Sequence, residues 1–167
     1  MLWMVGPGSG VGLEPQQFPL LLAVLAVGAV TGAVVAEPLV RRIPEVPLLV
    51  GCWAVNSGLL LVPVLLPTAP AIGAAFLVVG LTNMVGNVVG RTLRQRLVPT
   101  DRLGRVGGAS GMIGYGLMPL GALTGRVVGE IWGLPVAFVG AAAVSLATVG
   151  YVATAASTTL VRAHEIA

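Results

Sequence analysis

The feature that most constrains this chain is a series of long apolar stretches joined by short polar connections. Only 9% of its 167 residues are charged, whereas about 25% is usual for a soluble domain. A soluble fold needs a charged exterior, and this chain has too few charges to cover one. Because a helix that crosses a bilayer needs about 20 mostly apolar residues, the stretches predict an all-α integral membrane protein.

Five stretches are long enough to span a bilayer, and we expect them to form one bundle over residues 17–155. They cover residues 17–40, 46–66, 70–89, 106–128 and 134–155. Pro63 should kink the second stretch, since proline lacks the N–H that the interior of a helix uses. The third should continue as a helix past the bilayer until Pro99 stops it. Residues 1–16 are then an extracytoplasmic segment, and residues 156–167 are a cytoplasmic tail.

The arginines are distributed as in the loops of a membrane protein. All nine basic residues are arginines, and eight of them follow the first, third or fifth predicted span. Arg126, near the far end of the fourth span, is the exception. The positive-inside rule assigns the arginine side to the cytoplasm, so the N-terminus is expected outside and the C-terminus inside. The same distribution argues against nucleic-acid binding despite a net charge of +3, because no basic face is formed.

Patterns that signal catalysis or cofactor binding are missing from the sequence. The single histidine, His164, and the single cysteine, Cys52, have no companion at the spacing of metal ligands. A phosphate-binding loop of the Walker type needs a lysine, and the chain has none. We therefore expect no enzyme activity, no cofactor and no metal.

Three polar residues within the spans are candidates for a cavity. Asn83 and Asn87 lie four residues apart on one helix face, and Arg91 and Arg94 continue that face toward the cytoplasm. Polar side chains inside a span face protein or a water-filled cavity, so the two asparagines either form hydrogen bonds between helices or line a substrate path. Arg126 either extends to the lipid headgroups or binds an anionic substrate, and it can pair with Glu130.

Two arginine-rich stretches on the cytoplasmic side contain the remaining candidates. They are interpreted either as ordinary anchors of the positive-inside kind, which need arginines but no particular order, or as functional motifs in which the order of residues matters. In the second stretch, Asp101 and Arg105 are four residues apart at the start of a predicted helix, where an acid suits the helix dipole and can pair with arginine. The residues of interest in the two stretches are Glu37, Arg41, Arg42, Arg94, Asp101 and Arg105.

Glycines recur at intervals of four residues along the predicted spans. Small residues at this spacing let helix backbones approach closely in lipid, so they predict tight packing and are compatible with helices that slide or rock. The glycine pairs are Gly28/Gly32, Gly86/Gly90, Gly104/Gly108, Gly107/Gly111 and Gly121/Gly125/Gly129.

Three segments resemble the C-terminal half of a major facilitator superfamily transporter of the bacterial drug- and siderophore-exporter type. The segment from Gly12 to Arg42 is similar to the end of helix seven, helix eight and a copy of the cytoplasmic gating motif. Arg94 to Val106 resembles the loop between helices ten and eleven, and Pro119 to Gly133 resembles helix eleven and its turn into helix twelve. This group usually has a small residue at the position of Arg126.

The resemblance implies helices eight to twelve of a twelve-helix transporter in a bacterial inner (plasma) membrane, a truncated form of the six-helix C-terminal half. It also implies alternating access, export of small amphipathic molecules by proton antiport, and inactivity without a missing N-terminal half or another copy. In such a transporter Asn83, Asn87 and Arg126 face the substrate cavity. The cytoplasmic gate would comprise Glu37, Arg41, Arg42, Arg94, Asp101 and Arg105. The alternative is a stand-alone membrane protein with a structural or helix-docking role.

Overall fold

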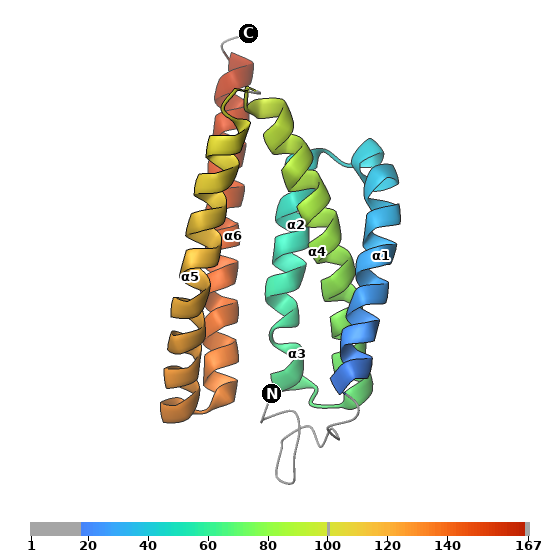
Figure 1. Cartoon of the computed structure of the whole chain (residues 1–167), viewed down its shortest axis with the longest axis vertical. Helices are drawn as coiled ribbons and strands as arrows, with labels where there is room; N and C mark the ends of the chain where they lie inside the picture. The colour runs from blue at the N-terminus through green and yellow to red at the C-terminus, as the bar shows by residue number, and fades with distance from the viewer. Residues whose placement is uncertain (1–17, 100, 166–167) are drawn as a thin grey trace.

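The computed structural model describes residues 18–99 and 101–165, with side chains described between residues 19 and 155. Every element in the described part of the chain is a helix. The helices are α1 (Phe18–Arg42), α2 (Glu45–Leu59), α3 (Val62–Leu65), α4 (Ala69–Leu97), α5 (Leu103–Trp132) and α6 (Leu134–Glu165). The long helices run side by side in alternating directions (Figure 1). The predicted N-terminal segment, residues 1–16, lies outside the described residues, and α6 continues into the predicted tail.

Prolines set two of the boundaries, as predicted. The second span breaks between α2 and α3 just before Pro63, and the Leu61 N–H bonds to the Gly58 carbonyl at 3.0 Å in a tighter turn. Pro63 has no N–H to continue the helical pattern. At the end of α4, Val98 is extended, with φ −104° and ψ 126°, which is the conformation that a following proline favours.

The closest packing in the described part of the chain joins α1 to α4. A methyl group added at Gly28 would collide with the main-chain oxygen of Leu77, and one added at Gly80 would collide with that of Leu25. At Gly32 the added carbon would lie 2.5 Å from the Leu81 oxygen. The two backbones therefore touch directly at positions that only glycine can occupy, and the predicted role of Gly28 and Gly32 in close packing is confirmed.

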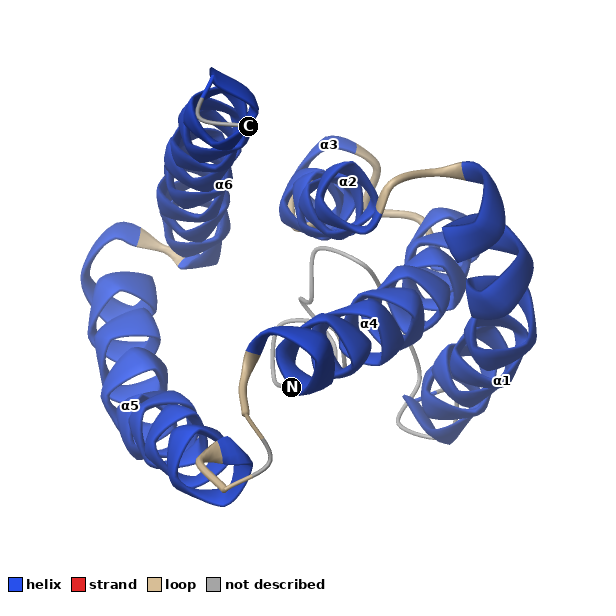
Figure 2. Ribbon diagram, turned by 90° about the horizontal axis from the view of Figure 1, so that it is seen from above, coloured by secondary structure: helices blue, strands red, loops and turns tan. Residues whose placement is uncertain are grey.

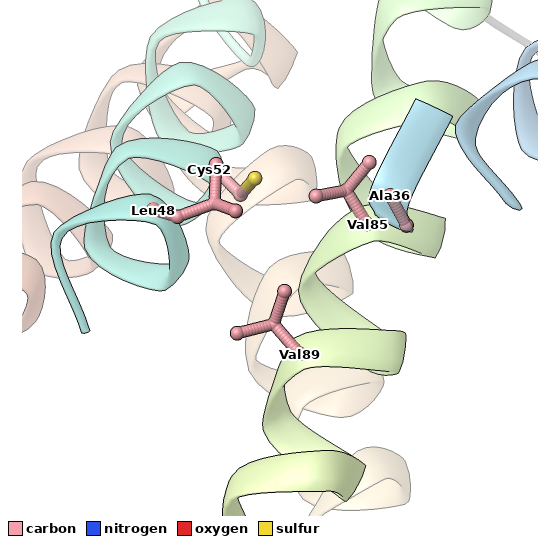
Figure 3. Packing of buried hydrophobic residues seen from close by; sticks show 5 residues of the cluster. All are labelled: Ala36, Leu48, Cys52, Val85 and Val89. Carbon is pink, nitrogen blue, oxygen red and sulfur yellow. The ribbon is translucent and has the colours of Figure 1, made fainter. Parts of the chain in front are cut away.

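A small apolar cluster joins α1, α2 and α4. Its buried members are Ala36, Leu48, Cys52, Val85 and Val89, which Figure 3 shows converging from the three helices. Val85 is fully buried and Val89 is 1% exposed. Together with the glycine contact, this cluster makes α4 the central helix, with α1 on one side and α2 on the other (Figure 2).

Helices α5 and α6 form a separate hairpin beside this unit. Gly133, with φ +87°, makes the turn between them, a conformation that glycine adopts without steric cost. The hairpin reaches the other helices mainly through contacts between α6 and α2. No residue of α5 is buried, and six of its seven paired glycines have open space where a side chain would begin: Gly104, Gly107, Gly108, Gly111, Gly121 and Gly125. The predicted tight packing is therefore wrong for these positions within the described chain.

Four helical segments in the described part are long and apolar enough to cross a membrane. They are Pro19–Arg42, Glu45–Leu65, Ala69–Leu97 and Leu134–Ala155. They coincide with four of the five predicted spans, and they make the chain a multi-pass α-helical membrane protein. The predicted span at residues 106–128 is not among them. It lies in α5, where nine glycines among 30 residues, together with Arg126, lower the hydropathy.

The α1–α4 contact predicts that replacing glycine by alanine has different effects on stability at Gly80 and at Gly140. Gly80→Ala should destabilise the protein by about 1–3 kcal/mol, the usual cost of overpacking, because the new methyl group meets the main chain of α1. Gly140→Ala in α6, where the space is open, should leave stability unchanged or raise it slightly, since alanine favours helix. Thermal unfolding in mild detergent measures both, and equal stability of the two variants would contradict the packing described here.

Candidate functional site

A cluster of small polar side chains, which was not predicted from the sequence, lies between α2, α4 and α6. The Ser57 and Ser145 hydroxyl oxygens are 2.5 Å apart, which links α2 to α6. Ser57 already donates to the Trp53 carbonyl at 2.8 Å. A hydroxyl has one proton, so Ser145 must be the donor in the bond between the two serines.

A second polar contact joins α2 to α4. The Thr82 hydroxyl lies 2.9 Å from Asn56 Oδ1 and 2.7 Å from the Val78 carbonyl oxygen, so the two acceptors compete for one proton. Thr82 is 9% exposed and Ser57 is 2% exposed. Buried polar groups away from water need such partners, and every buried side-chain N or O atom in the described residues has one.

These polar groups border a cavity of about 630 Å³ whose lining comes from all the helices except α5. Most of the lining is apolar, and Trp53, Phe76 and Phe138 contribute aromatic rings. The polar lining residues are Asn56, Ser57, Asn83, Ser145 and Thr148. The volume lies within the range of roughly 300–1,000 Å³ that is typical of small-molecule sites, which are also mostly apolar with a few polar groups.

A second cavity, of about 350 Å³, lies between α2 and α4 and extends toward the end of α4. Trp53, Asn56 and Asn83 line both cavities, so the two adjoin at these side chains. The other lining residues of the second cavity are Leu49, Thr82, Gly86, Asn87, Gly90, Arg91 and Arg94. The lining therefore changes from apolar and aromatic at one end to amide and guanidinium groups at the other.

The structure places both predicted asparagines at this site. Asn87 Nδ2 donates to the Asn83 carbonyl oxygen at 2.9 Å and to Asn83 Oδ1 at 2.7 Å. Both bonds lie within α4, and both side chains are exposed on the cavity side. Beside the cavities, hydrogen bonds between helices are instead made by Thr82 with Asn56 and by Ser57 with Ser145.

Arg126 does not join Asn83 and Asn87. It lies on α5 and lines neither of the two cavities. Its Nε donates to Glu130 Oε1 at 2.8 Å, which confirms the predicted pair, and the two side chains are 74% and 62% exposed. Exposed pairs one helical turn apart contribute only a few tenths of a kcal/mol.

The six candidate gate residues do not form one cluster. Glu37 and Arg41 pair within α1 at 2.7 Å and are both 76% exposed, whereas Arg94 lines the second cavity. The expected pairing of Asp101 with Arg105 is not seen: the ion pair of Asp101 is with Arg102, at 3.6 Å. Helix α5 begins at Leu103, so Asp101 precedes the helix and does not share a helical face with Arg105.

One ion pair between helices was missed by the sequence analysis. Arg96 Nη1 donates to Glu45 Oε1 at 2.7 Å and joins the end of α4 to the start of α2. The Glu45 side chain is 16% exposed. The only available signal was an acid at the start of one helix and a base at the end of another, and sequence spacing does not reveal such pairs.

The bond between Ser57 and Ser145 predicts a measurable coupling between α2 and α6. A double-mutant cycle with Ser57→Ala and Ser145→Ala should give a coupling of about 0.6 kcal/mol, and no more than about 1.7, the range found for hydrogen bonds in membranes. Unfolding in mixed micelles measures it. A control cycle with Ser57→Ala and Thr124→Ala, whose hydroxyl bonds within α5, should give none. Equal coupling in both cycles would contradict a direct bond.

No group of three potential metal ligands is found among the residues that the structure describes. Comparison of the chain with protein-family models, with curated proteins and with solved structures gave no match.

Proposed function

We propose that this chain is part of a secondary transporter and that the two adjoining cavities form part of its substrate path. The observation that carries the proposal is the graded lining, from aromatic and apolar side chains around Phe76 to the arginines at the end of α4. A path through a bilayer needs polar groups at membrane depth that face a cavity rather than lipid. Asn56, Asn83 and Ser145 are such groups.

We also propose that α5 is a fifth span. Helix α4 ends where α5 begins, and α6 begins at the opposite end of the molecule (Figure 1). If α4 and α6 both cross the bilayer, the 30 residues of α5 are what connects its two sides. At 1.5 Å per residue they extend about 45 Å, which exceeds a hydrocarbon core of about 30 Å. The arginines then assign the C-terminus to the cytoplasm.

The resemblance to major facilitator transporters supports export of small amphipathic molecules by proton antiport, with alternating access between two bundles. In that scheme Glu37, Arg41, Arg42 and Arg94 belong to the cytoplasmic gate, with Asp101 and Arg105. Neither cavity has an Asp or Glu among its described lining residues. The proton-coupling acid is therefore assigned to another part of the intact transporter.

The exposure of α5 favours a second candidate function, a helix-docking role in the membrane. Its glycines leave a smooth face without a partner in the described chain, and such faces pair closely in lipid. The partner in this scheme is a second copy of the chain. A defined dimer in mild detergent, lost on Gly111→Leu and kept on Gly140→Leu, is the expected result. A monodisperse monomer would exclude this candidate.

The transport proposal predicts that filling the larger cavity blocks flux. Val79→Trp, on the cavity lining, should reduce dye efflux at least tenfold, because the new ring occupies the path. Val78→Trp is the matched control, since Val78 is 36% exposed and lines neither cavity. Efflux of cationic, neutral and anionic amphipathic dyes is measured in cells that express the chain from its own locus. Equal efflux in the two variants would refute the path.

The proposed topology predicts which loops react from outside the cell. In a Cys52→Ala background, Thr68→Cys and Glu130→Cys should react with a membrane-impermeant maleimide in intact cells. Arg42→Cys and Arg102→Cys should react only after permeabilisation. Labelling of Glu130→Cys and Arg102→Cys from the same side would show that α5 does not cross, while the other two positions check the orientation independently.

A further inference from the structure

We propose that the two cavities together bind an elongated amphipathic anion. Its negative group lies between Arg91 and Arg94, and its apolar part occupies the larger cavity beyond Trp53. The inference rests on the proposed function, for which it names the class of substrate. It is supported by three features: the positive charge of Arg91 and Arg94, the open volume beside them, and the change to an apolar lining in the larger cavity.

The arginines of the second cavity carry unbalanced positive charge. The four ion pairs in the described part of the chain involve Arg41, Arg96, Arg102 and Arg126. Arg91 and Arg94 are in none of these pairs, although both line the cavity. They are three residues apart, so they lie on the same face of α4. Guanidinium groups bind carboxylate, sulfonate or phosphate oxygens through two parallel hydrogen bonds.

The space beside the arginines is kept open by glycine. Gly90 and Gly86 line the same cavity, about one and two turns before Arg94, respectively. A methyl group at Gly90 would lie 3.8 Å from Leu49 Cδ1, and one at Gly86 would lie 3.7 Å from Cys52 Cβ. These are ordinary contact distances, so close helix packing does not require glycine at either position. What glycine provides here is volume between the arginines and Asn83.

The polar groups along the cavity suit a ligand that carries oxygen atoms behind its charged end. Asn87 uses its Nδ2 to bond Asn83. Among the described residues this leaves Asn83 Nδ2 as a donor and Asn87 Oδ1 as an acceptor. Such amides can bond an ester, amide or hydroxyl group of the ligand, but they supply no compensating negative charge.

The length of α4 between the two ends of the site defines the shape of the ligand. Asn83, where the cavities adjoin, and Arg94 are separated by about 16 Å along the helix at 1.5 Å per residue. A compact anion such as phosphate would reach the arginines and leave the larger cavity empty. A molecule that fills both must be elongated, with its charge at one end and an apolar body against Trp53 and Phe76.

The test is equilibrium binding, measured through Trp53. The protein is purified in a neutral maltoside detergent with Trp3→Phe and Trp132→Phe, so that Trp53 is the one tryptophan left. The probe is brominated dodecanoate, whose bromine quenches a tryptophan that it touches, and brominated dodecanol is its uncharged match. The carboxylate should bind at least tenfold more tightly than the alcohol. Equal binding of both probes would overturn the proposal.

Four variants separate the role of charge from that of folding. Arg94→Gln should weaken carboxylate binding about tenfold or more, the order expected when a hydrogen bond to a charged group is lost, and should leave alcohol binding unchanged. Arg94→Lys should retain most of the affinity. Arg102→Gln, at an exposed arginine that lines neither cavity, should retain all of it. Gly90→Leu should abolish binding by filling the space. Unchanged carboxylate affinity in both Arg94→Gln and Gly90→Leu would refute the site.

Two further experiments test whether the anion is a lipid or a free molecule, and whether this inference and the transport proposal stand or fail separately. In nanodiscs, phosphatidylglycerol but not phosphatidylcholine should displace the probe if the natural ligand is an anionic lipid; displacement by neither assigns the site to a free amphipathic anion. If the purified chain binds the carboxylate while Val79→Trp and Val78→Trp give equal efflux in cells, this inference stands and the transport proposal fails. A chain that exports dyes but binds carboxylate and alcohol equally does the reverse.

Discussion

The backbone contact between α1 and α4 is the interaction on which the rest of the structure depends. In a bilayer, apolar side chains gain little by leaving lipid for protein, so close contact and hydrogen bonding must hold helices together. Gly28, Gly32 and Gly80 let two main chains meet, and this contact fixes one face of α4. The opposite face is then available to α2 and to the cavities. The polar residues of α4 are consequently presented on the side away from α1.

Some residues of the site bond one helix to another, while neighbouring residues on the same helix leave space between the helices. Thr82 bonds Asn56 and thereby joins α4 to α2, while the adjacent Asn83 bonds within its own helix and leaves the cavity open. Where α4 ends and α2 begins, the ion pair of Arg96 with Glu45 joins the two helices again. Glycine has two uses in α4: Gly80 brings α1 close, whereas Gly86 and Gly90 keep volume free beside α2.

Features governed by local chemistry could be predicted from the sequence, and those that depend on distant partners could not. Pro63 and Pro99 act through their own rings, so the helix breaks fall where they were expected. Asn83 and Asn87 were identified by spacing along one helix. The partners of Ser57 and Glu45 lie 88 and 51 residues away in sequence, and no periodic pattern marks such pairs. The expected bond from Asp101 to Arg105 failed because the helix begins two residues after Asp101.

The hairpin of α5 and α6 has a consequence for how the protein loses its structure. It meets the remaining helices mainly through α2, and the serine bond lies at that contact, whereas α1 and α4 are joined along their backbones. Stability within a protein divides into cooperative units according to such contacts. We therefore expect the hairpin to separate first, while α1, α2 and α4 remain assembled. Amide exchange would then report two separate opening events, one for the hairpin and one for the unit of α1, α2 and α4.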